Sequence, residues 1–357
     1  MLTEPRLLAL EDLPKQFLPP WLYGDSAVAE QEQHAYAGRL WHPLAAAGSL
    51  AEGQVLPVVL LEQPLLLTRL GGVVRAFRNR CPHRGVPFEA VEAAPLARSC
   101  RRLVCPYHGW TYDLQGQLRA AARESDFLEP FCRNDWPLEA FACRELGGLI
   151  WVAGGPDPLP LEEQLDLLLA EAGDALSQPR LLLGVDQRSL DCNWKIAHDN
   201  TLDDYHVAIA HPTTLHREQG PVRQYRHALT AHGSLLATPW GEDSAEFLTF
   251  GLAPWTHLLL WPDQRLALIQ FPPIDPSHCA MQVWLLGLEE HRAGLEAWRA
   301  ELQTFLEEDR RLVEGAQLGY ANGLQPGPPH RLEQRILQQQ ALYGRLMGLE
   351  LTAESPA

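Results

Sequence analysis

Short apolar runs separated by turn residues dominate the first part of the chain. Between about residues 37 and 155, runs such as "VLPVVLLEQPLLLTRL" are followed by turns, and Gly71-Gly72 is typical of a tight hairpin. The stretches "WTYDLQGQL" and "LGGLIWVAGG" indicate further strands. The pattern therefore predicts a domain of short antiparallel strands joined by loops.

The remaining residues mix helical and strand patterns. A proline-rich joint, "GGPDPLPLEEQ", covers residues 154–164 and marks a domain boundary. Helical spacing is found at 161–173, 196–211, 292–320 and 331–349, and strand patterns at 180–190, 257–271 and 279–289. We therefore expect an α+β protein, with one domain over 37–155 and a second, built from 1–36 and 156–357, in which a sheet packs against helices.

Composition narrows the functional classes. The 357 residues carry a net charge of −16, which argues against a nucleic-acid partner or an anionic membrane surface. The N-terminal stretch "MLTEPRLLALEDLPKQ" has acidic residues where a signal peptide needs a basic start, and no apolar run approaches the ~20 residues of a membrane span. A cytoplasmic enzyme is the expectation. Seven irregularly spaced cysteines fit reduced thiols or metal ligands better than a disulfide framework.

Two short clusters, "CPHRG" and "CPYHGW", carry the first candidate metal site. They supply Cys81, His83, Cys105 and His108. A zinc module usually places its cysteines together and its histidines together, whereas each loop here offers one of each. This arrangement favours a Rieske [2Fe–2S] centre, in which two cysteines hold one iron and two histidines the other. Zinc remains the alternative.

A second candidate site begins in "NWKIAHDNTLDDYHVAIAH", residues 193–211. On a continuous helix, Asn200, Asp203 and His206 share one face. His206 and His211 converge if the helix distorts or ends near His211-Pro212. Two histidines need one carboxylate to form the facial triad of a non-heme Fe(II) oxygenase.

The long helix predicted over 292–320 offers that carboxylate. Its apolar stripe runs through Trp298, Leu302, Phe305, Leu312 and Ala316, and position 309 falls within it. A carboxylate inside a buried stripe is costly unless it is paired or binds a metal, so Asp309 is the predicted third ligand. Glu307 and Glu308 fall off the stripe, and we expect both to be solvated.

The motifs resemble those of one family. "NRCPHRG…CPYHGWTYDLQGQL" is similar to the Rieske domain of the ring-hydroxylating and choline/carnitine-monooxygenase-type oxygenase α subunits. The gap between the clusters is a few residues longer than usual, which indicates a loop insertion within "VPFEAVEAAPLARSCRRLV". "DN-x2-D-x-YH-x4-H" and "EEDRRLVEGAQLGY" resemble the family's iron-binding and carboxylate-bearing segments. The resemblance implies an antiparallel β Rieske domain followed by a helix-grip catalytic domain.

The same resemblance implies cofactors and partners. It implies a [2Fe–2S] cluster, a mononuclear Fe(II) and a head-to-tail homotrimer, in which Asp203 matches the carboxylate that links the cluster of one chain to the iron of the next. We take Asp203 and Asn200 as candidate catalytic residues. The chain has no G-x-G-x-x-G fingerprint, so electrons are expected from an external NAD(P)H-dependent reductase or a ferredoxin.

The implied reaction is hydroxylation or oxidative N-demethylation of a small organic substrate with O2. Aromatic residues between the two iron-ligand segments offer a cation–π cage for a quaternary ammonium group, or simply pack the sheet; they are Trp240, Phe247, Phe250, Trp255 and Trp261. Aromatic ring dioxygenation is an alternative. Two non-catalytic alternatives are a Rieske electron carrier and a helix-grip ligand-binding protein with a zinc module.

Overall fold

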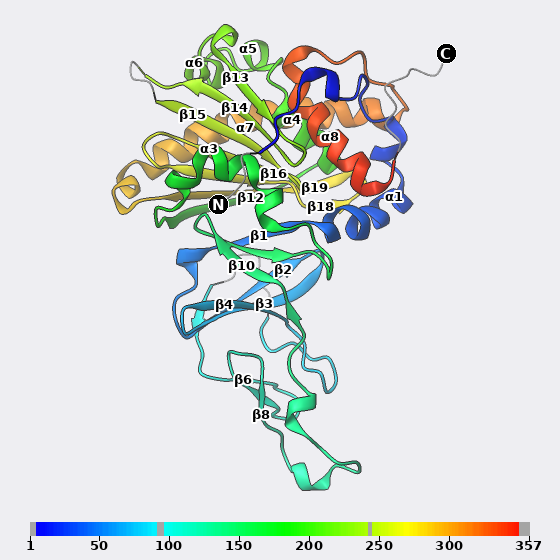
Figure 1. The fold of residues 1–357 in the computed structure, drawn as a ribbon, viewed down its shortest axis with the longest axis vertical. Helices are drawn as coiled ribbons and strands as arrows, with labels where there is room; N and C mark the ends of the chain where they lie inside the picture. The colour runs from blue at the N-terminus through cyan, green and yellow to red at the C-terminus, as the bar shows by residue number, and fades with distance from the viewer. Residues whose placement is uncertain (1–4, 91–95, 242–244, 350–357) are drawn as a thin grey trace. The chain divides into compact units, whose positions relative to one another are not determined.

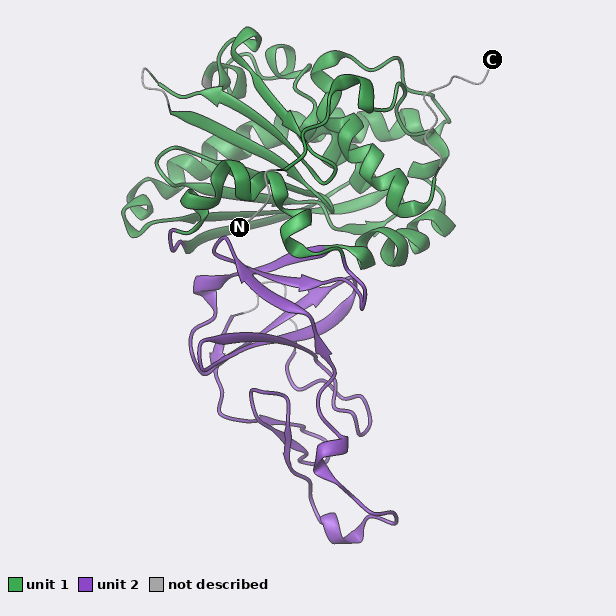
Figure 2. Cartoon of the chain, viewed as in Figure 1, with its two compact units in different colours: residues 1–40, 159–177, 181–357 green, residues 41–158, 178–180 purple. Residues whose placement is uncertain are grey.

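The structure, a computed structural model, describes residues 5–90, 96–241 and 245–349. The chain forms two units with separate cores (Figure 2). The smaller unit comprises residues 41–158 and 178–180, and the larger unit contains residues 1–40, 159–177 and 181–357. The smaller unit lacks residues 37–40 of the predicted Rieske domain and adds 156–158 and 178–180.

The smaller unit is built from three antiparallel sheets (Figure 1). In sheet order, they are β1 (Trp41–Ala46), β11 (Leu149–Ala153) and β10 (Cys143–Leu146); β5 (Arg98–Ser99), β2 (Gln54–Leu60), β3 (Gln63–Leu70), β4 (Val73–Arg78) and β9 (Ala140–Phe141); and β6 (Leu103–Val104), β7 (Thr111–Tyr112) and β8 (Leu118–Ala120). The β3–β4 hairpin turns at Gly71 and Gly72, whose φ angles of 64° and 71° favour glycine. This predicted hairpin is confirmed.

The larger unit is an antiparallel sheet with helices against it. Its strand order is β12 (Leu181–Leu190), β19 (His278–Gly287), β17 (Leu266–Gln270), β16 (Thr256–Leu260), β15 (Glu246–Leu252), β14 (Gly233–Pro239) and β13 (Arg226–Leu229), with β18 (Pro273–Asp275) paired to β19. Its α-helices are α1 (Ser26–Gln31), α2 (Leu161–Gln164), α3 (Asp166–Leu176), α4 (Trp194–Leu202), α5 (Val207–Ala210), α6 (Leu215–Gln219), α7 (Leu295–Ala321) and α8 (Gln334–Met347).

Two long helices hold α4 against the sheet. Helix α7 packs on β12 and α4, while α8 packs on β14 and α4. Helix α4 also contacts β16 and β19. The predicted α+β class, with an antiparallel β domain and a helix-grip catalytic domain, is confirmed. In the described part of the chain, no helix has the length and apolar character needed to cross a bilayer.

The prediction of one continuous helix over residues 196–211 is wrong. Helix α4 ends at Leu202, Asp203 has an extended ψ of 96°, and α5 begins only at Val207. The side chain of Asp203 causes the break, because its Oδ1 accepts hydrogen bonds from the backbone amides of Tyr205 (2.8 Å) and His206 (3.3 Å). An aspartate that bonds the backbone two residues on favours a turn over a helix.

The apolar stripe of the long helix also differs from the prediction. The buried residues on α7 are Trp298, Leu302, Leu306, Val313 and Gln317. Leu312, predicted to be on the stripe, is 45% exposed. The stripe is therefore displaced, but position 309 still lies between Leu306 and Val313 on its buried side.

Candidate metal centres

The two Cys/His loops have the same backbone design. In the first, the amide of Cys81 donates to the carbonyl of Val86 (2.9 Å) and that of Gly85 to Cys81 (2.8 Å). In the second, Cys105 donates to Trp110 (2.8 Å) and Gly109 to Cys105 (3.0 Å). The glycines have φ angles of 76° and 68°, which side chains strongly disfavour. Each loop is thus a tight turn that presents one cysteine and one histidine.

Residues 91–95 of the predicted loop insertion lie outside the described residues.

Like residues pair across the two loops. Cys81 and Cys105 are both buried, and burial together with the neighbouring Cys105 sulfur raises the pKa of the Cys81 thiol to about 11. The rings of His83 and His108 lie 4.5 Å apart, and Trp110 stacks on His83 at 5.0 Å. The Nδ1 atoms of both histidines are enclosed and have no protein partner. Buried polar atoms without partners are rare and mark sites that bind something else.

The spacing of these donor atoms distinguishes one metal ion from two. Four ligands of a single zinc lie ~4 Å or less from one another, because each bond is ~2.0–2.3 Å long. Among the described residues, only His206, His211 and Asp309 place three donor atoms within 4.8 Å of one another. No three of the four loop donors therefore share one ion. Separate cysteine and histidine pairs fit the two irons of a Rieske cluster.

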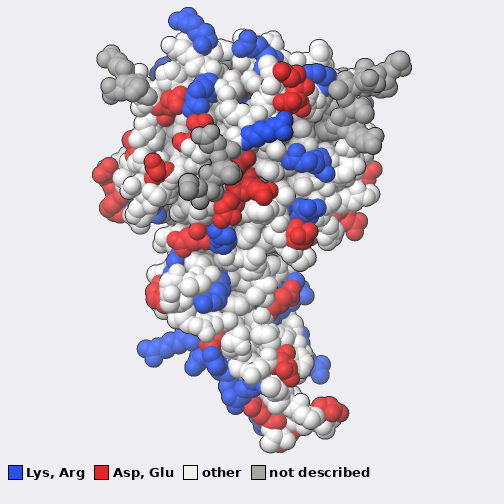
Figure 3. All heavy atoms as spheres, in the orientation of Figure 1, with Lys and Arg blue, Asp and Glu red and all other residues white. Residues whose placement is uncertain are grey.

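The histidine side of these loops is exposed. Pro82 and Pro106 are exposed, and Tyr107 is 59% exposed. Arginines on and beside the loops are also exposed, namely Arg80, Arg84, Arg101 and Arg102. In the view of Figure 3, basic side chains gather on the smaller unit. The face next to the candidate cluster is therefore open and carries positive charge.

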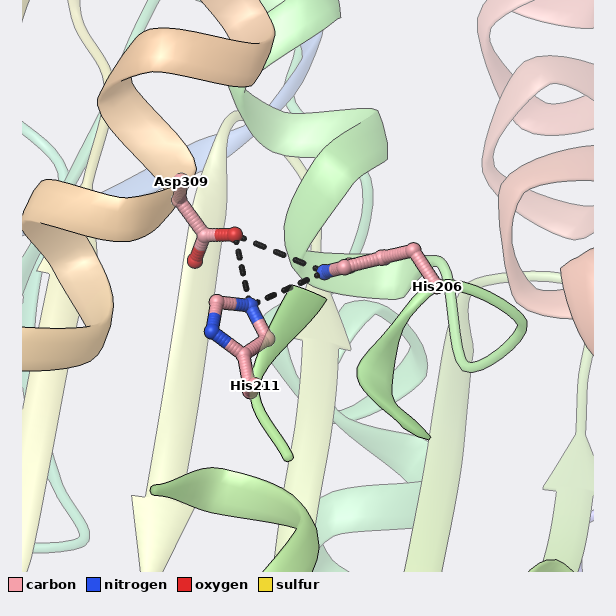
Figure 4. A group of neighbouring side chains, drawn as sticks. All are labelled: His206, His211 and Asp309. Carbon is pink, nitrogen blue, oxygen red and sulfur yellow. Dashed lines mark hydrogen bonds and ion pairs between the residues drawn. The ribbon is translucent and has the colours of Figure 1, made fainter. Parts of the chain in front are cut away.

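The second candidate site lies where the chain breaks between α4 and α5. Figure 4 shows His206 and His211 pointing toward Asp309 of α7. His211 Nε2 lies 2.9 Å from Asp309 Oδ1 and 3.2 Å from His206 Nε2, and His206 Nε2 lies 3.4 Å from Asp309 Oδ1. His206 precedes α5 and His211 follows it, so one short turn of helix sets the spacing of both. The turn at Asp203 thus aims two imidazoles at one point.

The outer nitrogens of both imidazoles face carboxylates. Asp203 Oδ2 lies 3.3 Å from His206 Nδ1, and Glu308 Oε2 lies 2.7 Å from His211 Nδ1. The hydrogen bond to Glu308 keeps the proton on Nδ1 of His211, and the charge of Asp203 favours a proton on Nδ1 of His206; either way Nε2 is left free to bind a metal. Two such nitrogens and one carboxylate oxygen, all facing one point, are the donor set of a two-histidine, one-carboxylate iron site.

The charges at this site are strongly coupled. Burial alone would lower the pKa of His206, but Asp203 and Asp309 raise it to about 10. Burial likewise opposes a charge on His211, whose pKa Asp309 and Glu308 nevertheless raise. Burial disfavours ionised Asp309, yet His206 and His211 lower its pKa to about 2. Without metal the histidines hold protons, which a bound cation displaces.

Glu308 is the residue that sequence reasoning missed. We expected it in solvent, but its carboxylate accepts from His211 and from Thr214 Oγ1 (2.9 Å). The neighbouring Glu307 instead pairs with Arg310 and Arg188. The sequence offers one signal, which is that Glu308 directly precedes the predicted ligand Asp309 and so lies close to whatever Asp309 contacts. Nothing in the sequence near Glu308 indicated that it would contact His211, which is 97 residues away.

A narrow cavity adjoins the site. Its lining includes the side chains of Asn200, Asp203, His206 and Asp309, the hydrogen-bonding residues Gln219, Thr249 and His257, the buried pair Asp204 and Arg335, and the apolar residues Val207, Leu215, Leu259, Ile269, Phe305 and Leu306. Asn200, Asp203 and His206 also border a second cavity of about 680 Å³. Asn200 and Asp203 therefore lie between two openings, next to the site.

The five aromatic residues proposed as a cation cage do not line the cavity beside the site. Phe247 packs on Trp240 and Trp261, and Trp255 packs on Trp194. Phe250 is fully buried in the sheet. The packing interpretation therefore describes these residues.

Known proteins match both units. Residues 40–131 match the Rieske [2Fe–2S] domain, and residues 179–349 match the catalytic domain of the ring-hydroxylating α subunit. The chain belongs to the Rieske non-heme iron oxygenase α subunits. The resemblance seen in its motifs is thereby confirmed, and the chain is an oxidoreductase of the mono- and dioxygenase class.

Relatives of this oxygenase include enzymes of both classes. The carnitine monooxygenase oxygenase subunit of Acinetobacter pittii (strain PHEA-2) is 27% identical over 341 residues, covering 87% of this chain and 89% of that one. The terminal oxygenase component of carbazole 1,9a-dioxygenase from Sphingomonas sp. is 34% identical over 172 residues, covering 47% and 42%.

Solved structures share the fold. The quaternary ammonium Rieske monooxygenase CntA superposes with a TM-score of 0.79 at 22% identity, covering 96% of this chain and 99% of that one. Naphthalene 1,2-dioxygenase from Rhodococcus sp. gives 0.76 at 20% identity, covering 95% of both chains. The shared fold extends over both units of the oxygenase.

Proposed function

We propose that this oxygenase binds a mononuclear Fe(II) through His206, His211 and Asp309 and a [2Fe–2S] cluster through Cys81, His83, Cys105 and His108. Bound iron supplies the activation of O2, and the cluster supplies electrons. The convergence of two Nε2 atoms and one carboxylate oxygen within 4.8 Å is the observation that carries the proposal. The unpartnered Nδ1 atoms of His83 and His108 support the cluster.

The chain's own residues have distinct roles in this proposal. Glu308 accepts a hydrogen bond from His211 Nδ1, and the Asp203 carboxylate lies 3.3 Å from His206 Nδ1 and favours a proton there, which keeps both Nε2 atoms available. Asn200 borders the same openings and orients what enters them. The apolar residues of the adjoining cavity exclude water from the substrate carbon that is oxidised. The reaction is hydroxylation or oxidative N-demethylation of a small organic molecule.

Electron delivery requires partners. We propose an external NAD(P)H-dependent reductase or ferredoxin, and a homotrimer in which the Rieske unit of one chain serves the iron of the next through Asp203. Asp203 suits this role because its carboxylate contacts His206 on one side and borders a separate cavity on the other. The structural study of CntA that describes inter-subunit electron transfer supports the arrangement.

Metal and sulfide analysis of anaerobically purified protein tests the proposal. About three irons and two acid-labile sulfides per chain are expected, with the visible spectrum of a reduced Rieske centre. One zinc without sulfide would overturn both metal assignments.

Ring dioxygenation is the second candidate, because the carbazole dioxygenase component shares 34% identity over its matched region. The fate of ¹⁸O2 separates the two. A monooxygenase places one labelled atom in a hydroxylated product, or in the aldehyde that N-demethylation releases, and a ring dioxygenase places two in one diol product.

A further inference from the structure

A buried histidine in the catalytic unit has no hydrogen-bond partner. His257 of β16 is only 5% exposed, and its Nδ1 is enclosed without a partner. Its side chain lines the cavity beside the metal site, on the face that also carries Leu259 and, across the strand pair, Ile269. Buried polar groups are normally bonded, and exceptions mark functional positions.

The imidazole of His257 is neutral. Burial, and then the charges of Arg335 and His198, hold its pKa well below the usual range. A neutral imidazole has one N–H to donate and one nitrogen that accepts. His257 therefore offers hydrogen bonds but no charge to a molecule in the cavity.

Gln219 adds a second donor to the same cavity. Its Oε1 accepts from the hydroxyl of Tyr225 (3.1 Å), so its amide nitrogen is left to donate. The side chain is 3% exposed and lines the cavity with His257. An oxygen that enters the cavity thus meets donors from β16 and from α6.

The only Lys or Arg side chain in the cavity lining is paired with a carboxylate. Arg335 is 1% exposed, and its guanidinium donates to Asp204 (3.1 Å) and to the carbonyl of Thr249 (3.1 Å). Asp204 also contacts His227 at 2.9 Å. These contacts fix Arg335 at the cavity wall, where the carboxylate of Asp204 neutralises its charge. Asp203 and Asp309 also line this cavity.

Two aromatic groups outside the cavity lining already hold cations. Lys195 Nζ lies 5.2 Å, 5.0 Å and 5.7 Å from the ring centres of Tyr23, Trp194 and Tyr343. Arg265 lies 5.4 Å from Trp261 and 5.3 Å from Trp298. In the cavity lining itself, Phe305 is the sole Phe, Tyr or Trp. A trimethylammonium group finds no free cage among these residues.

We infer that the substrate is recognised through a hydrogen-bond-accepting oxygen, a carbonyl or a carboxylate, held by His257 and Gln219, and not through a cationic nitrogen. The carbon to be oxidised must then face His206 and Asp309, which line the same cavity. A methylated amine fits this inference only if it also carries such an oxygen. The inference rests on the proposed function, because it names the substrate class of the same site.

Three molecules of matched shape test this recognition by isothermal titration calorimetry under anaerobic conditions. They are 3,3-dimethylbutanamide, 3,3-dimethylbutanoate and propyltrimethylammonium. We expect the amide or the carboxylate to bind at least tenfold tighter than the cation, and the tighter of the two identifies the natural acceptor. Equal or tighter binding of the cation, or no binding by any of the three, would overturn the inference.

Variants locate the binding group. His257→Leu should weaken the amide and carboxylate at least tenfold and leave the cation unchanged, while His257→Gln, which keeps a donor, should restore part of the loss. His278→Leu, at the exposed start of β19, is the matched control. Unchanged binding in His257→Leu would show that the oxygen is held elsewhere. Iron content is measured on every sample, so failure of the metal proposal is seen separately from failure of this one.

Discussion

Glu308 Oε2 lies 2.7 Å from His211 Nδ1, and Asp309 Oδ1 lies 2.9 Å from the other nitrogen of the same ring. Adjacent carboxylates on α7 therefore contact both ends of one imidazole. The hydroxyl of Thr214 donates to Glu308 and fixes the outer carboxylate in place. The ring is thereby held with Nδ1 protonated and Nε2 facing the metal position.

Removing the outer carboxylate should weaken iron binding. We expect Glu308→Ala to lower the affinity for Fe(II) by ~10–100-fold, the usual effect of losing a partner behind a ligating histidine. The Fe(II) affinity of Glu308→Gln, whose amide oxygen can still accept from His211 Nδ1, should lie between that of Glu308→Ala and that of the unaltered protein. Competitive chelator titration measures the affinity. The control is Glu307→Ala, which removes the neighbouring glutamate that pairs with Arg310 and Arg188; equal affinities in the two alanine variants would refute the role of Glu308.

Loss of the proposed third ligand should impair the candidate iron site and leave the candidate Rieske cluster intact. Losing a residue behind a ligating histidine, such as Glu308, usually costs ~10–100-fold in metal affinity or activity. Asp309→Ala should lower the activity further, because it removes one of the three proposed iron ligands. The visible spectrum of the Rieske cluster should survive, since its ligands lie in the other unit. Turnover with native iron content in this variant would show that Asp309 is not a ligand.

The sequence predicted the folds of both units and the segments that carry the candidate ligands. These signals were local: each loop pairs Cys with His two or three residues on, and Asp309 interrupts an apolar stripe. Local spacing is set by covalent geometry, so it can be read without knowing the fold.

Features that depend on side-chain contacts could not be predicted in the same way. The helical periodicity of 196–211 is real, but the Asp203 side chain bonds to backbone amides and ends α4. The solvated position expected for Glu308 was wrong because His211 and Thr214 approach it from another segment. For the aromatic residues between the candidate ligand segments, the sequence favoured sheet packing over a cation cage but could not decide between them, because only their packing partners distinguish the two.

The charge of Asp203 should matter for electron transfer more than for folding. Asp203→Asn keeps an oxygen that can accept from the Tyr205 and His206 amides, so the turn should persist. It loses the negative charge beside His206 Nδ1. We expect both metals to be retained and cluster oxidation in a single turnover with O2 to slow by at least ~10-fold.

Rapid-mixing absorption spectroscopy follows this oxidation. Asp191→Asn, which alters an acid whose side chain is 78% exposed, serves as the matched control. If Asp203→Asn oxidises its cluster as fast as the control does, the carboxylate does not link the two centres.

A buried ion pair ties α4, which leads into the candidate iron site, to the N-terminal segment and α8. Glu32 accepts from Lys195 Nζ (2.6 Å), Trp194 Nε1 (2.8 Å) and Tyr343 Oη (2.7 Å). Both charged side chains are 4% exposed, and burial lowers the pKa of Lys195 despite the opposing effect of Glu32. Glu32→Gln leaves this ammonium without its counter-charge.

We expect Glu32→Gln to reduce the free energy of unfolding of the catalytic unit by ~3–5 kcal/mol, as for other broken buried pairs. Urea unfolding followed by tryptophan fluorescence measures the change, and Glu30→Gln, at an exposed position of α1, is the control. Replacing both partners, in Glu32→Leu with Lys195→Met, should recover most of the loss, because no buried charge then lacks a partner. An unaltered midpoint in Glu32→Gln would mean that the pair does not hold α4 in place.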